Sequence, residues 1–149
     1  MLGQARRRTA RAGWSNVTLL QIDAAHLDPT LLRRLTPCGH GVNAVLATYS
    51  LSVIPRWRRA WRLATAAARP GARAAVVDLG LPTGLSAPLI PLARLACALG
   101  GSDPRRDPGR FAVRKTTDRQ HQRLLGGHVV VDAGTLTDAG MRGSAAPRS

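Results

Sequence analysis

The sequence predicts an α/β fold, because short apolar runs typical of buried strands alternate with segments of helical periodicity. Four of these runs are rich in Val, Ile, Leu and Ala and are bounded by turn-forming residues. Nearly continuous apolar runs of this length suit strands that are buried on both faces. The chain of 149 residues is long enough for one domain with its own core.

The expected strands are separated by turn signals and follow one another along most of the chain. They cover residues 17–22, 42–49, 72–79 and 127–133, with a weaker fifth strand at residues 111–117. The ends of the expected strands carry glycine, proline, asparagine or aspartate, as expected for turns between strands and helices.

The clearest helix lies between the second and third expected strands. Its apolar face repeats at i, i+3, i+4 and i+7 and comprises Trp57, Ala60, Trp61, Ala64, Ala67 and Ala68. Pro55 suits a helix start, and Pro70 with Gly71 suits a helix stop. The flanking strands are therefore expected to be parallel, joined by a right-handed crossover.

Two further helical segments are expected. Residues 87–99 place Leu89, Leu92, Ala93, Ala96 and Leu99 on one face. Pro88 fits the first turn of this helix, whereas Pro91 is expected to distort it. Residues 5–12, near the amino terminus, are also helix-like and basic.

The charge balance is strongly basic, with a formal net charge of +14 and an isoelectric point near 11.9. Such a charge favours polyanion binding through counterion release. However, Lys115 is the only lysine among 22 basic residues, and so complete an arginine bias is more simply a mark of a GC-rich coding sequence. We therefore expect no specific nucleic-acid partner.

No membrane segment or secretory signal is expected. The longest stretch without formal charge, residues 35–55, approaches the length of a spanning helix but is interrupted by Pro37, Gly39 and Gly41. The basic amino-terminal segment is not followed by an apolar region. Cys38 and Cys97 show neither a metal-binding spacing nor a disulfide framework, so a cytoplasmic location is predicted.

Several of these segments, in order, resemble class I S-adenosylmethionine-dependent methyltransferases. Residues 16–25 resemble the third strand of that family and the acidic and small residues that follow it. Residues 42–53 are similar to its fourth strand and the following loop, and residues 68–78 to a helix end, a Pro-Gly turn and the fifth strand. Residues 126–135 resemble the last strand of the ubiquinone/menaquinone-type small-molecule enzymes.

The resemblance implies an incomplete Rossmann-like methyltransferase sheet, mostly parallel with an antiparallel C-terminal strand. It would form a partial methyltransferase domain over residues 1–136, followed by a disordered tail at 137–149. The family's Gly-rich cofactor loop and its ribose-binding acid lie before the matching part. Without the strands that carry them, residues 17–22 must pair directly with 42–49 or stay unpaired.

The resemblance also assigns four cofactor-binding residues: Asp23, Ala24, Tyr49 and Ser50. Asp23 would accept a hydrogen bond from the adenine amino group, and Ala24 would leave room beside the ring. An ordinary turn after each strand is the alternative for these positions. Asp78 ends a strand and could face the substrate or simply cap a turn.

Other chemistry receives less support from the sequence. Residues 39–44 fit GxGxxA, but they precede a strand rather than follow one, which favours a turn. The family usually carries Asp at the position of Asn43. His26, His40, His121 and His128 are interpreted as surface or loop residues, so the catalytic residue is left unknown and no metal site is predicted.

The sequence therefore predicts transfer of a methyl group from S-adenosylmethionine to a small-molecule acceptor. This chain alone is expected to bind the cofactor weakly or not at all. The rival hypothesis is a basic interaction module or truncated remnant that binds nucleic acid or anionic surfaces non-specifically. A non-functional fragment is a third alternative, and the oligomeric state is not predicted.

Overall fold

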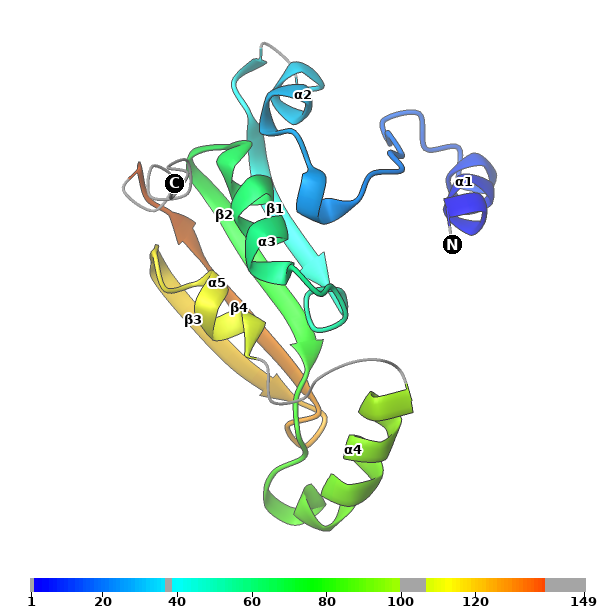
Figure 1. Cartoon of the computed structure of the whole chain (residues 1–149), viewed down its shortest axis with the longest axis vertical. Helices are drawn as coiled ribbons and strands as arrows, with labels where there is room; N and C mark the ends of the chain where they lie inside the picture. The colour runs from blue at the N-terminus through cyan, green and yellow to red at the C-terminus, as the bar shows by residue number, and fades with distance from the viewer. Residues whose placement is uncertain (1, 37–38, 100–106, 139–149) are drawn as a thin grey trace.

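The computed structural model describes residues 2–36, 39–99 and 107–138, which contain one four-stranded sheet in the order β1-β2-β4-β3 (Figure 1). The strands are β1 (Val42–Thr48), β2 (Ala68–Leu79), β3 (Thr116–Leu124) and β4 (Val129–Leu136). β1 and β2 are parallel, whereas β4 is antiparallel to both of its neighbours. Three strands thus run one way and the C-terminal strand runs the other, which confirms the predicted fold class.

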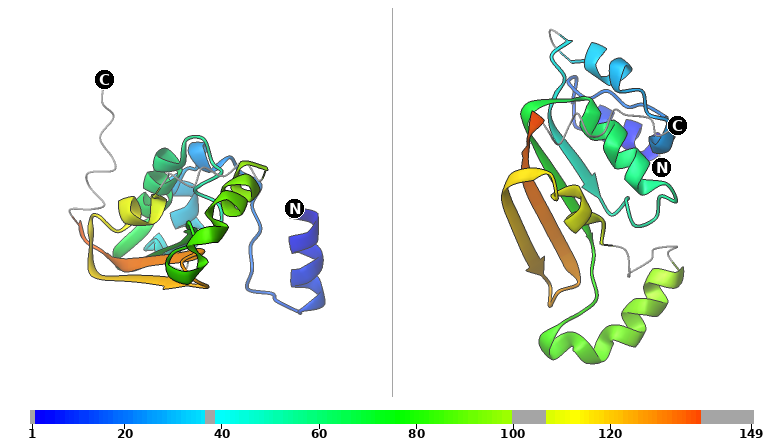
Figure 2. Two further views of the ribbon diagram at one scale, coloured as in Figure 1. Left: turned by 90° about the horizontal axis from the view of Figure 1, so that it is seen from below. Right: turned by 60° about the vertical axis from the view of Figure 1, so that its left-hand side comes forward.

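Among the described residues, helices cover one face of this sheet. They are α1 (Leu2–Arg11), α2 (Pro29–Arg34), α3 (Trp57–Ala66), α4 (Ile90–Leu99) and α5 (Pro108–Ala112), with short 3-10 turns η1 (Ala24–His26) and η3 (Gly84–Leu89). Figure 2 shows α3 and α5 on the same face of the sheet. Figure 1 shows α4 beyond the end of the sheet and α1 standing apart from it.

The predicted β-α-β unit is present as β1, α3 and β2. The helix starts after Pro55, as expected, but ends before Pro70 and Gly71, which instead lie in a register irregularity at the start of β2. The approach to β1 is tight: a Cβ on Gly41 would lie 2.6 Å from the carbonyl oxygen of Ala67, and Gly41 has a φ of 91°. Residues 39–41 thus form the turn before β1, whereas residues 42–44 of the GxGxxA match already belong to the strand.

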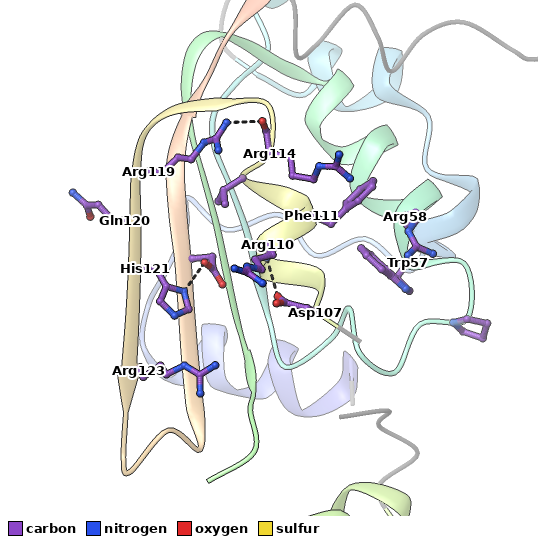
Figure 3. A pocket seen from close by; sticks show the side chains of 13 residues that line it. Trp57, Arg58, Asp107, Arg110, Phe111, Arg114, Arg119, Gln120, His121 and Arg123 are labelled. Atoms are coloured by element: carbon purple, nitrogen blue, oxygen red, sulfur yellow. Dashed lines mark hydrogen bonds and ion pairs between the residues drawn. The ribbon is translucent and has the colours of Figure 1, made fainter. Parts of the chain in front are cut away.

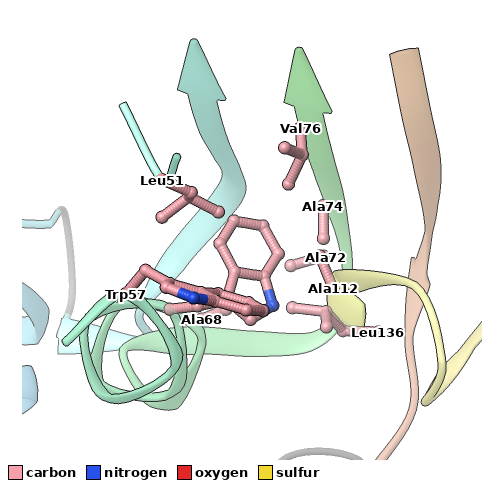
Figure 4. Packing of buried hydrophobic residues seen from close by; sticks show 9 residues of the cluster. Leu51, Trp57, Ala68, Ala72, Ala74, Val76, Ala112 and Leu136 are labelled. Carbon is pink, nitrogen blue, oxygen red and sulfur yellow. The ribbon is translucent and has the colours of Figure 1, made fainter. Parts of the chain in front are cut away.

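The core lies between the sheet and α3, where large indoles meet small strand side chains. Trp57 and Trp61 are buried against Ala72, Ala74 and Val76 (Figure 4). Alternate residues of β2 point to this face. Alanine at these strand positions leaves the volume that the tryptophans fill, as close packing requires.

Two strand predictions are wrong. Residues 17–22 form no strand, and Val17, Leu20 and Ile22 are exposed. A strand needs a hydrogen-bonded neighbour, and within the described residues β1 pairs only with β2. Residues 111–117 form the end of α5, a turn and the first residues of β3 rather than a strand of their own.

One face of the sheet and the outer edges of β1 and β3 stay open within the described residues. β1 is an edge strand, and Leu46 on its uncovered face is 65% exposed.

Residues 139–149 of the predicted tail, and Cys38, lie outside the described residues; Cys97 is a buried free thiol. Among the residues described, no helix combines the length and the apolar character needed to cross a membrane.

Candidate functional site

The carboxyl ends of β1 and β2 lie side by side, as expected for two parallel strands, and Tyr49 and Ser50 follow β1 there. The backbone N–H of Tyr49 donates to the carbonyl of Val77 at 2.8 Å. Tyr49 then turns the chain with a φ of 48°, and its side chain is 52% exposed. Ligands of open α/β sheets bind at this end of the strands, so Tyr49 is available to one.

Asp78, near the end of β2, fastens the loop that follows β1. Its Oδ1 accepts the Ser52 hydroxyl at 2.7 Å and the Leu79 N–H at 2.9 Å, and its Oδ2 accepts the Ser52 N–H at 3.1 Å. Asp78 is buried. These contacts give Asp78 the structural role, a cap on the loop, that was one of its two predicted alternatives.

Asp23 is an exposed carboxylate that caps the 3-10 turn η1. Its Oδ1 accepts the Ala25 N–H at 2.9 Å, and its Oδ2 lies 2.8 Å from Nδ1 of His26. The Ala25 hydrogen bond, the His26 hydrogen bond and the charges of His26 and Arg56 together hold the pKa of Asp23 below its usual range. The carboxylate therefore stays ionised in moderately acidic solution.

The turn η1 is anchored to α3, because Nε of Arg59 donates to the carbonyl of Ala25 at 2.8 Å. The segment with Asp23 and Ala24 thus lies near the start of the helix that follows the Tyr49 loop. No hydrogen bond within the described residues joins these two positions to Tyr49 or Ser50. The structure brings the two predicted pairs to neighbouring segments without joining them in one cluster.

A cavity of about 1160 Å³ lies between α3, α5 and β3, and none of the four predicted cofactor residues lines it (Figure 3). It is lined by Pro55, Trp57, Arg58, Asp107, Arg110, Phe111, Val113, Arg114, Arg119, Gln120, His121, Arg123 and Asp132. Figure 3 shows Arg110, His121 and Arg123 toward β3, with Arg58 beside Trp57 and Phe111 on the other side. Five arginines thus face one concavity.

A His-Asp pair sits in the wall of this cavity. His121 of β3 and Asp132 of β4 are directly opposite in the antiparallel register, and Nδ1 of His121 lies 2.8 Å from Oδ1 of Asp132. Asp132 is 2% exposed, and its Oδ2 has no hydrogen-bond partner within the described residues. A Cβ on Gly109 of α5 would overlap this oxygen, so the close approach of α5 requires glycine there.

The sequence interpretation of His121 as a surface residue is confirmed, because its side chain is 51% exposed, but the pairing with Asp132 is not predicted. The two side chains are eleven positions apart and meet only through the register of β3 with β4. The available signal was the alternation of Arg119, His121 and Arg123, which places three basic side chains on one face of a strand.

A smaller cavity of about 270 Å³ extends from the carboxyl end of β2 to the same walls. It is bounded by Asp78 and Gly80 on one side and by His121, Arg123 and Asp132 on the other. The two cavities therefore share a wall. Among the described residues, no group of three or more His, Cys, Asp or Glu side chains could hold a metal ion.

Comparison with known proteins supports the fold alone. No family model and no curated protein matches the chain. A crystal structure of the S-adenosylmethionine-dependent methyltransferase SibL in its apo form superposes with a TM-score of 0.61 at 21% identity. A possible exported protein from Bordetella parapertussis superposes with a TM-score of 0.62 at 18% identity.

The superpositions cover 91% of this chain but only 40% and 50% of those two proteins, so the chain spans half of their length or less. The chain thus has a methyltransferase-like fold over the part that it spans.

Proposed function

We propose that the chain is the C-terminal portion of an S-adenosylmethionine-dependent methyltransferase acting on a small-molecule acceptor. The observation that carries the proposal is the sheet order β1-β2-β4-β3 with β4 antiparallel. The resembled family has the sheet order 3-2-1-4-5-7-6, and the order found here matches its 4-5-7-6 end. The superposition on a methyltransferase supports the same assignment.

Asp23 and Ala24 suit the adenine end of the cofactor. The Asp23 carboxylate is exposed and ionised, and each of its oxygens keeps a lone pair that could accept the adenine amino group. Ala24 adds no bulky side chain beside it. Within the described residues, no glycine-rich loop runs from a strand into a helix, so we expect this chain alone to bind the cofactor weakly or not at all.

Methyl transfer from a sulfonium ion asks mainly for alignment of the acceptor, the methyl group and the sulfur. The fastened loop between Tyr49 and Ser52 offers a rigid wall for such alignment, because Asp78 holds Ser52 by two hydrogen bonds. Proton removal would be needed only for an acceptor such as a hydroxyl. We assign no catalytic residue.

The test compares this chain with a version extended by the codons that lie in frame before Met1 in the genome. Binding of S-adenosylhomocysteine is followed by amide chemical shifts and calorimetry. We expect micromolar binding to the extended chain, with shifts at residues 23–26 and 49–52. Absence of binding there, or a stop codon directly upstream, would contradict the proposal and favour the basic interaction module.

Asp23→Asn in the extended chain should weaken binding about tenfold, the loss expected for one hydrogen bond to a charged group. Asp28→Asn is the matched control. Asp28 also caps a helix, accepting the Thr30 N–H at 2.8 Å, but it is not a predicted cofactor residue. Equal losses in the two variants would show that the Asp23 effect is only structural.

A further inference from the structure

The cavity between α3, α5 and β3 carries more positive charge than its own carboxylates can balance. Five arginines and two aspartates line it, which gives these seven side chains an excess of three positive charges. Like charges gathered in one concavity repel one another, and the concave shape concentrates their field. The arrangement therefore favours an anion in the cavity.

One oxygen of each aspartate is already engaged. Oδ1 of Asp107 accepts the backbone N–H of Arg110 at 2.9 Å and so caps α5. Oδ1 of Asp132 lies 2.8 Å from Nδ1 of His121. Within the described residues, none of the five arginines forms an ion pair with a carboxylate.

Some of the arginines are held in place by contacts that leave their charge uncompensated. Arg119 donates from Nε to the carbonyl of Thr116 at 3.0 Å and from Nη2 to that of Arg114 at 2.7 Å. The guanidinium of Arg58 stacks 4.5 Å from the centroid of the Trp57 ring. Neutral partners of this kind fix a guanidinium without neutralising it.

We propose that this cavity binds a small anion bearing a phosphate group, with Arg110 and Arg123 as its main ligands and His121 beside them. His121 and Arg123 are two residues apart on β3 and so share a face, and Arg110 reaches the same space from α5 (Figure 3). Guanidinium groups bind phosphate oxygens through paired, parallel hydrogen bonds.

The His121–Asp132 pair positions the third ligand. Because Asp132 is buried and holds Nδ1 of His121, the ring presents Nε2 to other partners. Nε2 then adds a third polar contact beside the two arginines. Three such contacts favour the terminal phosphate group of a monoester, which presents three free oxygens, over a phosphodiester, which presents two.

The cavity volume of about 1160 Å³ leaves room beyond the phosphate group and lies near the range typical of sites for small organic ligands. A phosphomonoester of a small metabolite fits this space, and free phosphate shares the same chemistry. The inference rests on the charge and geometry of this cavity and is independent of methyl transfer.

Calorimetry at constant ionic strength provides the test, with three probes: inorganic phosphate, ribose 5-phosphate and dimethyl phosphate. We expect the two dianions to bind and the diester to bind at least tenfold more weakly. Tighter binding of ribose 5-phosphate than of phosphate would identify a phosphomonoester as the ligand, and the reverse order would identify free phosphate. Equal binding of the diester would overturn the proposal and favour a nucleic-acid backbone.

Single substitutions test whether Arg110 and Arg123 bind the phosphate. Arg110→Gln and Arg123→Gln should each weaken phosphate binding about tenfold, and Lys at either position should retain part of the affinity because the charge remains. Arg94→Gln on α4, an exposed arginine away from this cavity, is the control that removes the same charge. Circular dichroism confirms folding. An equal loss in Arg94→Gln, or no binding of phosphate by the parent chain, would overturn the proposal.

Discussion

The carboxylate of Asp78 accepts both the hydroxyl and the backbone N–H of Ser52, at 2.7 and 3.1 Å, and thereby ties the loop after β1 to the end of β2. Both residues are buried. Buried donors that lose a charged acceptor are costly. The geometry of the Tyr49–Ser52 loop therefore depends on this one side chain.

Replacing Asp78 by Asn should lower the free energy of unfolding by about 1–3 kcal/mol. The NH₂ group of Asn would face one of the two Ser52 donors, which in the parent chain donates to a carboxylate oxygen. Urea denaturation of the two proteins measures the change. Asp118→Asn is the control: Asp118 is exposed on β3, so we expect a change within about 0.5 kcal/mol. If Asp78→Asn loses no more stability than Asp118→Asn, the loop is held by other contacts.

Truncation of Trp57 should be among the most damaging changes to stability. Its indole is buried and meets the Phe111 ring edge to face, with centroids 5.1 Å apart. Trp57→Ala should cost about 3–5 kcal/mol in unfolding free energy, through lost apolar burial and the cavity left behind. Trp14→Ala, at a position 53% exposed, should cost about 0.5 kcal/mol or less. Thermal and urea unfolding compare the two.

The depressed pKa of Asp23 makes a definite prediction about pH. Because the pKa of Asp23 is lower in the folded chain than in the unfolded chain, its contribution to stability is complete above the unfolded pKa and is lost as the pH falls through the folded pKa. A carboxyl-detected NMR titration should place the midpoint below the usual aspartate range. His26→Asn should raise the midpoint but leave it depressed, because the Ala25 N–H remains; an unchanged midpoint would contradict a role for His26.

Gly41 and Gly39 form a matched pair for testing the turn before β1. Both have positive φ, but a Cβ would find open space at Gly39 and the Ala67 carbonyl oxygen, 2.6 Å away, at Gly41. Gly39→Ala should cost about 1 kcal/mol, the penalty of the left-handed conformation. Gly41→Ala should cost distinctly more, because the backbone of Ala67 must also move. Equal costs in chemical denaturation would show that the contact relaxes freely.

Much of the fold could be predicted because its signals are local. The alanine and tryptophan stripe of α3, the apolar runs of β1, β2 and β4, and the prolines and glycines between them all act over a few residues. β3 carried no such signal: after Thr116 its residues are exposed and mainly polar. It is a strand because its backbone pairs with β4.

The wrong strand at 17–22 and the unpredicted pairing of His121 with Asp132 have one physical cause. An apolar run becomes a strand only beside a partner, and no strand among the described residues pairs with residues 17–22. His121 meets Asp132 only once the register of two strands is set. Asp23 and Tyr49 could be named from sequence as candidate residues, but no local pattern places their two segments in space.

The open edge of β1 makes the behaviour of the chain in solution sensitive to salt. An unpaired edge beside the exposed Leu46 is a template on which a second copy could add a strand. A net charge of +14 keeps copies apart at low ionic strength, and this repulsion is screened over about 10 Å at 0.1 M salt. Salt should therefore promote self-association, so that colloidal stability, as distinct from folding stability, depends on the electrolyte in which the protein is stored.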